Sequence, residues 1–586
     1  MNRRRFFGAT ATMLASPWLA YPFTLVCRRP HVQRVRRTGA TISWASAEPG
    51  TASVKVTGPD GVSRSVSAAS VRFNAGQGGA TTAFYRHWAA LESLDPATEY
   101  TYSILFDGRD ITPAGDMRFR TAGQQTFTFL AIGDSGTGSE EQKRLAAIFQ
   151  RDPAALVIHT GDLAYPTGTF ESYDRNYFDF YQELMARVPF FPVPGNHDYY
   201  DFNAEPYRAL HDLPRANVAE KDQGRYYSFD WGDVHFISLD SNAPLEEAAA
   251  GSGDMLRWLE ADLATTTKFW RVAVFHHPPY AFGPNQDDPL TILARERIVP
   301  ILERYHVPLI FGGHEHSYQR SVPVRGGGER ANGAVYLTTG GGGAALYPVY
   351  DSPLIAARAS VFHYMRIQVT GRRMRLAAIG IDGQAFDSFV VEPAPVVRGE
   401  LVNAASGTRA IGRGGLISIY GWQFTPEIWT NGGGDVRVRV GGVDAQVIAA
   451  SPMQINVALP AGLIGTQTVE ILTPVGSATA EIEVVPVAPA LFSDGVFENG
   501  RSQVTESSPC GPGSRVSLFL TGVGQWNGPV NLHVGGASTG SQMEAGLPGV
   551  QTLLFDVPAG IAPGTHTLQV EAGGQWSNTV TIYVKN

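Results

Sequence analysis

The alternation of apolar and polar positions divides the chain into stretches of different texture. Residues 28–122 alternate short strand patterns with turn residues, with strands expected at 40–44 and 99–105 and no helical pattern of any length. This pattern predicts a small β-sandwich of the immunoglobulin or fibronectin type. Residues 123–392 instead combine apolar strands with helical segments, which predicts a layered α/β domain. The expected helices lie at 140–150, 255–264 and 290–305.

After a linker that begins near residue 395, a Gly-rich β pattern returns and contains a weak internal repeat. Three short sequences recur in the same order, with a period of roughly 95 residues. They are VGG at 440–442 and 534–536, [LV]PAG at 459–462 and 557–560, and GT at 465–466 and 564–565. Chance reuse of such words in a Gly-rich chain is the alternative. We favour two tandem immunoglobulin-like sandwiches, at about 401–492 and 508–586, which makes the fold class multidomain α/β plus all-β.

Composition and charge exclude several classes of protein. A chain of 586 residues is too long for one hydrophobic core, and 43% hydrophobic with 17% charged residues excludes a disordered chain or a coiled coil. The net charge of −8 indicates no nucleic-acid-binding surface. Cys27 and Cys510 lie at opposite ends, so no disulfide framework is expected. The mature body has no apolar stretch of about 18 residues, so no membrane span is expected there.

The N-terminus has the features of a targeting signal. Arg3, Arg4 and Arg5 precede two phenylalanines and a mild apolar run over 8–20. A basic start followed by a short apolar segment predicts an export signal, here over 1–27, and the paired arginines suggest the twin-arginine route. We therefore expect a periplasmic or extracellular protein. The alternative is a basic, apolar N-terminus without function.

Polar clusters follow five apolar runs of the α/β region. Each cluster alone is typical of a turn or a hydrogen-bonded core residue. Because ligands bind at the carboxyl ends of strands in an open α/β sheet, we expect the five clusters to converge on one sheet edge. The residues are Asp134, Asp162 with Tyr165, Asn196 with His197 and Asp198, His276, and His314 with His316.

This set of side chains suits metal ions. Carboxylate, amide and imidazole groups without a thiolate favour Fe, Zn or Mn. Seven such groups are too many for one tetrahedral zinc. They suit two metals that share a carboxylate, an arrangement used for in-line attack at phosphorus.

The ordered motifs GDxG, GDxxY, GNH[DE], VxxH and GHxH resemble those of the purple acid phosphatases, within the calcineurin-like metallophosphoesterases. Four of the five motifs match to the letter. The remaining one, VxxH, has Ala273 in place of its Val. The resemblance covers roughly 28–392, because the PHVQ sequence at 30–33 and Trp44 are similar to that family's fibronectin III-like N-terminal domain.

The resemblance implies a role for each residue. A ferric ion would be bound by Asp134, Tyr165 and His316, and a divalent Fe, Zn or Mn by Asn196, His276 and His314, with Asp162 bridging both. A metal-bound hydroxide would attack the phosphorus atom of a phosphate ester. His197 would orient the phosphate or protonate the leaving oxygen, and Asp198 would orient His197.

The implied protein is an exported dinuclear metallophosphatase that hydrolyses phosphate monoesters. A phosphodiesterase or nucleotidase on the same site is one alternative. A surface-binding protein with a vestigial enzyme domain is another, although no ligand position is lost.

Some positions depart from the family pattern. The loop 281–288 lacks the histidines of plant members, which leaves Asn285 or Gln286 to hydrogen-bond the phosphate. His277 is expected to point away from the metals, because successive strand residues face opposite sides; substitution for the missing histidines is the alternative. Arg320, by contrast, matches the family's arginine after the last motif, and it is expected to make a structural ion pair rather than to approach the phosphate.

The tail modules resemble IPT/TIG-type sandwiches of exported bacterial proteins, which serve as spacers or binding modules. Cell-surface or carbohydrate contact is therefore a candidate partner class. Trp422 and Trp526 are expected to pack in module cores, and stacking on a sugar is the alternative.

Overall fold

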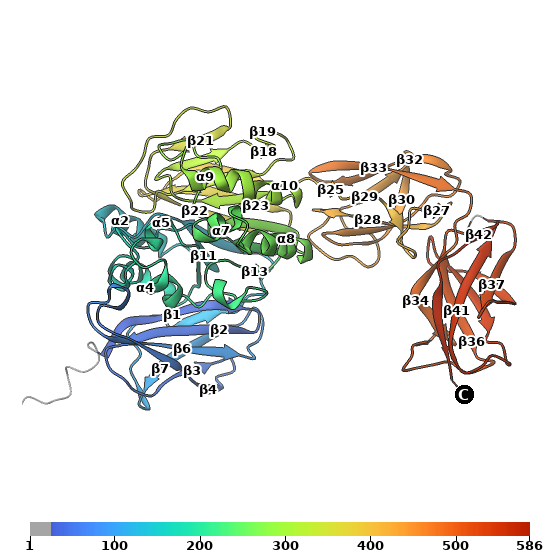
Figure 1. The fold of residues 1–586 in the computed structure, drawn as a ribbon, viewed down its shortest axis with the longest axis horizontal. Helices are drawn as coiled ribbons and strands as arrows, with labels where there is room; N and C mark the ends of the chain where they lie inside the picture. Colours follow the sequence, from blue (N-terminus) through green and yellow to red (C-terminus); the bar gives the residue numbers. More distant parts are fainter. Residues whose placement is uncertain (1–24, 525, 586) are drawn as a thin grey trace, which may run out of the picture.

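The computed structural model describes residues 25–524 and 526–585 (Figure 1). The predicted export signal lies outside the described residues except for its last three positions, and residues 26 and 27 begin the first strand. Within the described part of the chain, no helix has the length and apolar character needed to cross a membrane.

Nine strands form an N-terminal pair of antiparallel sheets, and the expected strands at 40–44 and 99–105 fall within β2 and β7. Trp44 is fully buried between the sheets, as the alternating pattern requires. The first sheet has the order β1 (Val26–Arg36), β2 (Gly39–Ser46), β6 (Phe84–Glu92) and β5 (Ala69–Phe73). The second contains β4 (Ser63–Ser67), β3 (Ala52–Thr57), β7 (Glu99–Phe106), β8 (Arg109–Asp110) and β9 (Arg118–Arg120).

The α/β region contains two large mixed sheets. The first has the order β12 (Phe190–Pro192), β11 (Leu156–His159), β10 (Phe127–Ile132), β22 (His363–Thr370), β23 (Arg373–Gly380) and β24 (Ala385–Val391). The second has the order β13 (Tyr227–Trp231), β14 (Val234–Ser238), β15 (Trp270–Val274), β16 (Leu309–Gly312), β20 (Val335–Thr339), β17 (Tyr318–Ser321) and β21 (Ile355–Ala359). A small hairpin joins β18 (Val324–Arg325) to β19 (Gly328–Glu329).

The expectation of one open sheet was wrong, because the five motif strands are shared between two sheets. Strands β10, β11 and β12 run parallel in the first sheet, and β15 and β16 run parallel in the second. The sheets pack face to face through aromatic side chains: the Phe129 ring on β10 lies 5.2 Å from that of Phe236 and 6.2 Å from that of Phe311. The carboxyl ends of all five strands still meet, at one end of this sandwich.

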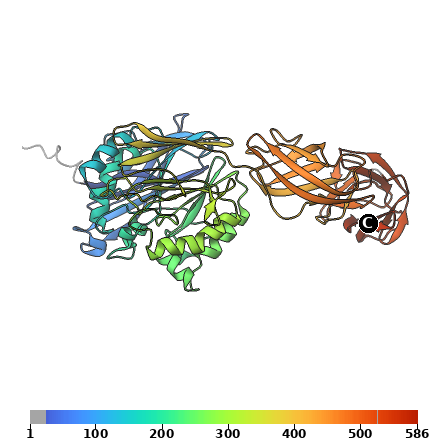
Figure 2. The same ribbon diagram turned by 90° about the horizontal axis from the view of Figure 1, so that it is seen from above.

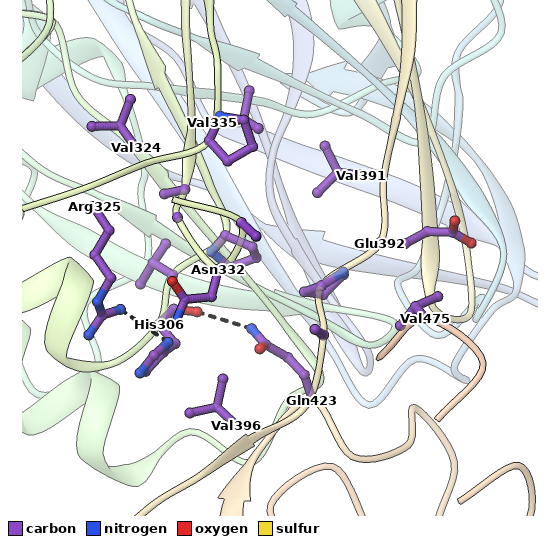
Figure 3. A pocket seen from close by; sticks show the side chains of 18 of the residues that line it. His306, Val324, Arg325, Asn332, Val335, Val391, Glu392, Val396, Gln423 and Val475 are labelled. Carbon is purple, nitrogen blue, oxygen red and sulfur yellow. Dashed lines mark hydrogen bonds between the residues drawn. The ribbon is translucent and has the colours of Figure 1, made fainter. Parts of the chain in front are cut away.

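Helices cover the two sheets (Figure 2). The predicted helix at 140–150 is α2 (Glu140–Phe149), which begins where the Ser139 side chain accepts a hydrogen bond from the Gln142 N–H. The predicted helix at 290–305 is α9 (Pro289–Leu293), a π-helical turn (Ala294–Ile298) and α10 (Val299–Arg304). The others are α3 (Phe170–Tyr173), a second π-turn (Asp174–Phe178), α4 (Asp179–Met185), α5 (Asn196–Tyr199), α6 (Glu205–Leu210), α7 (Ala243–Ala249) and α8 (Met255–Thr265).

The tail is all β and extends away from one side of the α/β sheets (Figures 1 and 2). Its first part contains β25 (Val396–Val397), β26 (Val402–Asn403), β27 (Ile411–Gly412), β28 (Leu416–Trp422), β29 (Arg437–Val440), β30 (Val443–Ala450), β31 (Gln454–Ala458), β32 (Gly465–Thr473) and β33 (Gly476–Val485). Its second part contains β34 (Ala490–Glu498), β35 (Ser502–Gln503), β36 (Arg515–Thr521), β37 (Val530–Val534), β38 (Ala537–Thr539), β39 (Ser541–Ala545), β40 (Gln551–Asp556), β41 (Gly564–Ala572), β42 (Gln575–Trp576) and β43 (Val580–Val584). Strand β34 pairs with β36, so this second part includes chain that precedes residue 508.

The internal repeat corresponds to repeated structure. The two VGG sequences form the turns that join β29 to β30 and β37 to β38. Both glycines of each turn have positive φ, which only glycine adopts without strain. The two GT sequences open β32 and β41. Equivalent positions in two sandwiches argue against chance reuse.

Trp422 lies at the junction between the α/β domain and the tail, where it is 5% exposed. The guanidinium groups of Arg271 and Arg398 lie 5.7 and 5.5 Å from its ring. Trp526 is partly buried against the core of the last module and donates a hydrogen bond to the Pro529 carbonyl. Trp526 therefore packs in its module core as expected, whereas Trp422 packs against the core of the α/β domain instead. The burial of Trp422 excludes the sugar-stacking alternative for it.

A salt-bridge triad on the second sheet gives a pH-dependent stability. The two ring nitrogens of His235 lie 2.7 Å from carboxylate oxygens of Asp230 and Asp262. Burial alone would lower the pKa of His235, but hydrogen bonds to these carboxylates outweigh it and raise the pKa to about 9. The triad thus stabilises the fold below the unfolded-state pKa of about 6.5, and this stability is lost as pH rises through about 9.

We expect His235→Gln to lower the free energy of unfolding by about 2 kcal/mol at pH 6 and much less at pH 9.5. Chemical denaturation of both proteins at the two pH values measures the difference. An equal loss of unfolding free energy at both pH values would show that the imidazole stabilises the fold by packing rather than by its charge.

Candidate metal centre

Three of the predicted ligands have an unusual backbone conformation. Asp134, Asp162 and His314 have φ values of 55°, 54° and 66°. Left-handed conformations are uncommon for residues other than glycine and cluster at functional sites. Each of the three follows directly on a glycine just beyond β10, β11 or β16. The chain turns sharply there and directs the side chain into the end of the sandwich.

Two motif glycines are required by close approach. A Cβ atom on Gly195 would lie 2.1 Å from Asp162 Oδ1, and one on Gly313 would lie 2.5 Å from Asp134 Oδ2. Both distances are too short for any side chain. The glycines of the third and fifth motifs therefore make room for the carboxylates of the first two.

One group of polar atoms centres on the Tyr165 hydroxyl. It lies 2.8 Å from Asp162 Oδ2, 3.3 Å from Asp134 Oδ1 and 3.2 Å from His316 Nε2. The His316 Nε2 atom is itself 3.5 Å from Asp134 Oδ1. The π-turn at Asp174–Phe178 holds the loop that carries Tyr165, since Asn176 Nδ2 donates to the Tyr165 carbonyl oxygen.

A second group centres on the amide oxygen of Asn196. Its Oδ1 atom lies 3.0 Å from His276 Nε2 and 3.1 Å from His314 Nδ1. His276 Nε2 is also 3.5 Å from Asp162 Oδ1. The other nitrogen of His276 faces the Thr160 carbonyl at 2.8 Å, which directs Nε2 into the group.

Asp162 belongs to both groups, with one carboxylate oxygen in each. The side chain is 1% exposed and lies between the two sets of donors. Burial would raise the pKa of Asp162, but His276 and His197 outweigh it and lower the pKa. Burial and then the carboxylates of Asp162 and Asp134 raise the pKa of Tyr165 far above its usual value. A phenolate at Tyr165 therefore requires a bound cation to offset these negative charges.

The residues present fit two metal ions. Atoms that share a metal at about 2.1 Å lie roughly 3 Å apart, close to the separations of 2.8–3.5 Å within the two groups. His314 turns Nδ1 toward Asn196 Oδ1 in the second group, and burial followed by repulsion from His276 lowers the pKa of this imidazole to about 3. A neutral imidazole is the form that binds metal.

His197 lies at the edge of the two groups, 27% exposed. Its Nδ1 atom is 2.7 Å from the Pro166 carbonyl, so this nitrogen carries the proton and Nε2 faces Asp162 Oδ2 at 4.0 Å. Its ring packs on that of Tyr165, with centroids 4.2 Å apart. The structure thus places His197 beside Asp162 and Tyr165, two of the predicted metal ligands.

The predicted role of Asp198 was wrong. The backbone N–H groups of Leu163 and Gly195 and the hydroxyl of Tyr173 donate to its carboxylate, and the Pro166 carbonyl orients His197 instead. Asp198 points away from His197 because the two are successive residues of the one-turn helix α5, whose side chains diverge. Asp198 ties the second and third motif loops together.

We expect Asp198→Ala to lower the free energy of unfolding by about 3 kcal/mol, because it leaves these three buried donors without an acceptor. Denaturation of metal-depleted protein measures this loss directly. Asp198→Asn should restore part of it. Full stability in the alanine variant would contradict the structural role.

His277 also departs from its prediction. It follows the end of β15, where strand alternation no longer applies, and its ring centroid lies 4.5 Å from that of His314. Ser241 Oγ contacts its Nδ1 at 2.8 Å. His276, His277 and His314 together place nitrogen atoms within 4.8 Å of one another. His277 therefore borders the second group instead of pointing away.

Other residues around the site have structural partners. Asn285 Nδ2 donates to the His314 carbonyl, so this amide holds the fifth motif. Asp288 begins α9, and its Oδ2 lies 3.9 Å from His314 Nε2. Arg320 pairs with Asp387 on β24, which confirms its structural role. Tyr347, which no motif indicated, stacks on His316 with ring centroids 4.1 Å apart.

With this geometry established, comparison with known proteins identifies the middle of the chain. Residues 127–318 match the family model described as calcineurin-like phosphoesterase. This part of the chain is a calcineurin-like phosphoesterase domain. The likeness to that family and to the purple acid phosphatases implies a dinuclear metal centre.

Several of the relatives carry acid phosphatase names, whereas those from Mycobacterium tuberculosis carry no functional name. A protein of Mycobacterium tuberculosis is 26% identical over 307 residues, which cover 44% of this chain and 57% of that protein. Purple acid phosphatase 21 of Arabidopsis thaliana is 27% identical over 303 residues, which cover 48% of this chain and 65% of that protein. The match thus spans less than two thirds of either relative.

A solved purple acid phosphatase from yellow lupin (Lupinus luteus) seeds shares the fold. The structural match covers 62% of this chain and 74% of the lupin chain, with a TM-score of 0.52 and 19% sequence identity. The common fold agrees with an α/β phosphoesterase core flanked by many-stranded β regions.

Proposed function

We propose that the protein is a metal-dependent phosphatase of the purple acid phosphatase type, which hydrolyses phosphate monoesters at a dinuclear centre. The observation that carries this proposal is Asp162, a buried carboxylate with one oxygen in each of two groups of metal-binding atoms. A shared carboxylate is what a two-metal site needs.

The chemistry of the two groups supports different metals. Asp134, Asp162 and Tyr165 supply anionic oxygens, which favour Fe³⁺. Asn196, His276 and His314 are neutral and suit a divalent Fe, Zn or Mn. When bound, the two cations supply a nucleophile at neutral pH and offset the charge of the phosphate.

The chain's own residues position the ester and move the proton. His197 presents Nε2 at the solvent edge of the centre, beside Asp162, while the Pro166 carbonyl holds Nδ1–H. In its protonated form it would donate a proton to the leaving-group oxygen. Asp162 is buried and Tyr165 is half-buried, and together they keep bulk water from one side of the site.

Comparison of 4-nitrophenyl phosphate with bis(4-nitrophenyl) phosphate tests the proposal. The full-length protein, loaded with iron plus zinc or manganese, should hydrolyse the monoester much faster. Preference for the diester would favour a phosphodiesterase on the same residues. Bound metals without turnover of either compound would contradict the proposed activity.

We further propose that the protein is exported, as the paired arginines before an apolar run suggest. Fractionation of cells that express the full chain tests this. Replacement of Arg3, Arg4 and Arg5 by lysine should retain the protein in the cytoplasm, whereas unchanged export would exclude the twin-arginine route.

A further inference from the structure

Tyr200 lies one helical turn after Asn196. The short helix α5 spans Asn196–Tyr199, and the Tyr200 N–H donates to the Asn196 carbonyl. Residues four apart on a helical turn are neighbours in space. Tyr200 is 48% exposed, so it stands at the open side of the metal centre.

The Tyr200 hydroxyl fixes the amide of Asn196. Asn196 Nδ2 donates to the Tyr200 phenol oxygen at 2.9 Å. The same amide directs Oδ1 to within 3.1 Å of both His276 Nε2 and His314 Nδ1. An amide has its acceptor on one side and its donors on the other, so anchoring the NH₂ group keeps the oxygen toward the cation position. A rotated amide would present N–H groups to a metal ion, which they cannot bind.

The Tyr200 ring also contacts His197. The two ring centroids are 4.9 Å apart at an interplanar angle of 61°. The same imidazole packs on the Tyr165 ring. Tyr200 and Tyr165 thus both restrict the position of His197, the proposed proton donor.

The proton of the Tyr200 hydroxyl has no acceptor among the described residues. The phenol oxygen accepts from Asn196, and the structure gives this hydroxyl no other hydrogen bond. A half-exposed O–H beside a ligand of the second metal can donate to an oxygen of a phosphate bound there.

We propose that Tyr200 is a positioning residue of the second metal site and a hydrogen-bond donor to the bound phosphate. This rests on the proposed phosphatase function. This role differs from packing, because it depends on the hydroxyl of Tyr200, which contacts the Asn196 amide, and not on the ring.

Tyr200→Phe tests the proposal, since it removes the oxygen and keeps the ring beside His197. The full-length variant, loaded with iron and zinc, is dialysed against graded zinc chelator, and bound zinc and iron are counted. We expect zinc to be lost at about tenfold lower chelator concentration, in line with the effect of removing partners that orient metal ligands. Iron retention and the unfolding temperature should be unchanged.

Inhibition by inorganic phosphate gives a second readout. We expect its Ki to rise about fivefold to tenfold in Tyr200→Phe, which corresponds to one lost hydrogen bond. The matched control is Tyr420→Phe, which removes the hydroxyl of a 43% exposed tyrosine on β28 in the tail and should change neither value.

Zinc retention and phosphate inhibition equal to those of the unmodified protein would overturn the proposal. Equal loss of iron and zinc, or a lower unfolding temperature, would show a general structural role instead. If the unmodified protein hydrolyses no phosphate ester but Tyr200→Phe still loses zinc selectively, the proposed function fails while the positioning of Asn196 stands.

Discussion

Replacement of Asp162 by alanine should lower kcat/KM for phosphate monoesters by roughly 1,000-fold or more. The side chain is buried, and its two oxygens face the two groups of metal-binding atoms. Loss of the shared carboxylate should weaken both metal sites at once and remove several kcal/mol of charge stabilisation from the transition state. Hydrolysis of 4-nitrophenyl phosphate, with metal content measured on the same samples, checks this.

Asp152→Ala is the matched control for this prediction. Asp152 is also buried, and Tyr364 and Arg366 donate to it outside the two groups of metal-binding atoms. Its replacement should reduce stability but leave kcat/KM and metal content nearly unchanged in the folded protein. If Asp162→Ala kept both metals and more than a tenth of the activity, the bridging role would be wrong.

Replacement of His197 by alanine should have an effect that depends on the leaving group. A proton donor matters most when the leaving oxygen is strongly basic, and such donors contribute about 100-fold to 10,000-fold. We therefore expect kcat/KM to fall about 100-fold for an alkyl phosphate and much less for 4-nitrophenyl phosphate. Steady-state kinetics on both substrates, with His566→Ala in the last module as control, measures the difference.

An equal fall for both substrates would contradict the proton-donor role. It would assign His197 to orientation of the phosphate, the other role that its position allows. The Pro166 carbonyl holds Nδ1 in either case, so the two roles are separated by kinetics and not by geometry.

The strands and helices with strong periodicity were predictable from the sequence. The predicted strand around Trp44 lies within β2, and α2 begins at a serine cap, so local pattern and structure agree. The division of the motif strands between two sheets was not predictable. It depends on long-range packing such as Phe129 against Phe311, which periodicity along one strand does not contain.

Within the site, prediction succeeded where a motif fixes both a residue and its backbone turn. Asp134, Asp162 and His314 each follow a glycine at a strand end, and the structure brings them together. Asp198 and His277 were misplaced, because a one-turn helix and a chain bend beyond a strand set their directions.

The number of metal ions bound to each chain tests the central claim most directly. Elemental analysis of the purified full-length protein should give two metal ions per chain, one of them iron. Phenolate bound to ferric iron gives a visible absorption band, which Tyr165→Phe should abolish without loss of the second metal. One metal ion or none per chain in protein that hydrolyses phosphate monoesters would contradict a dinuclear centre at these residues.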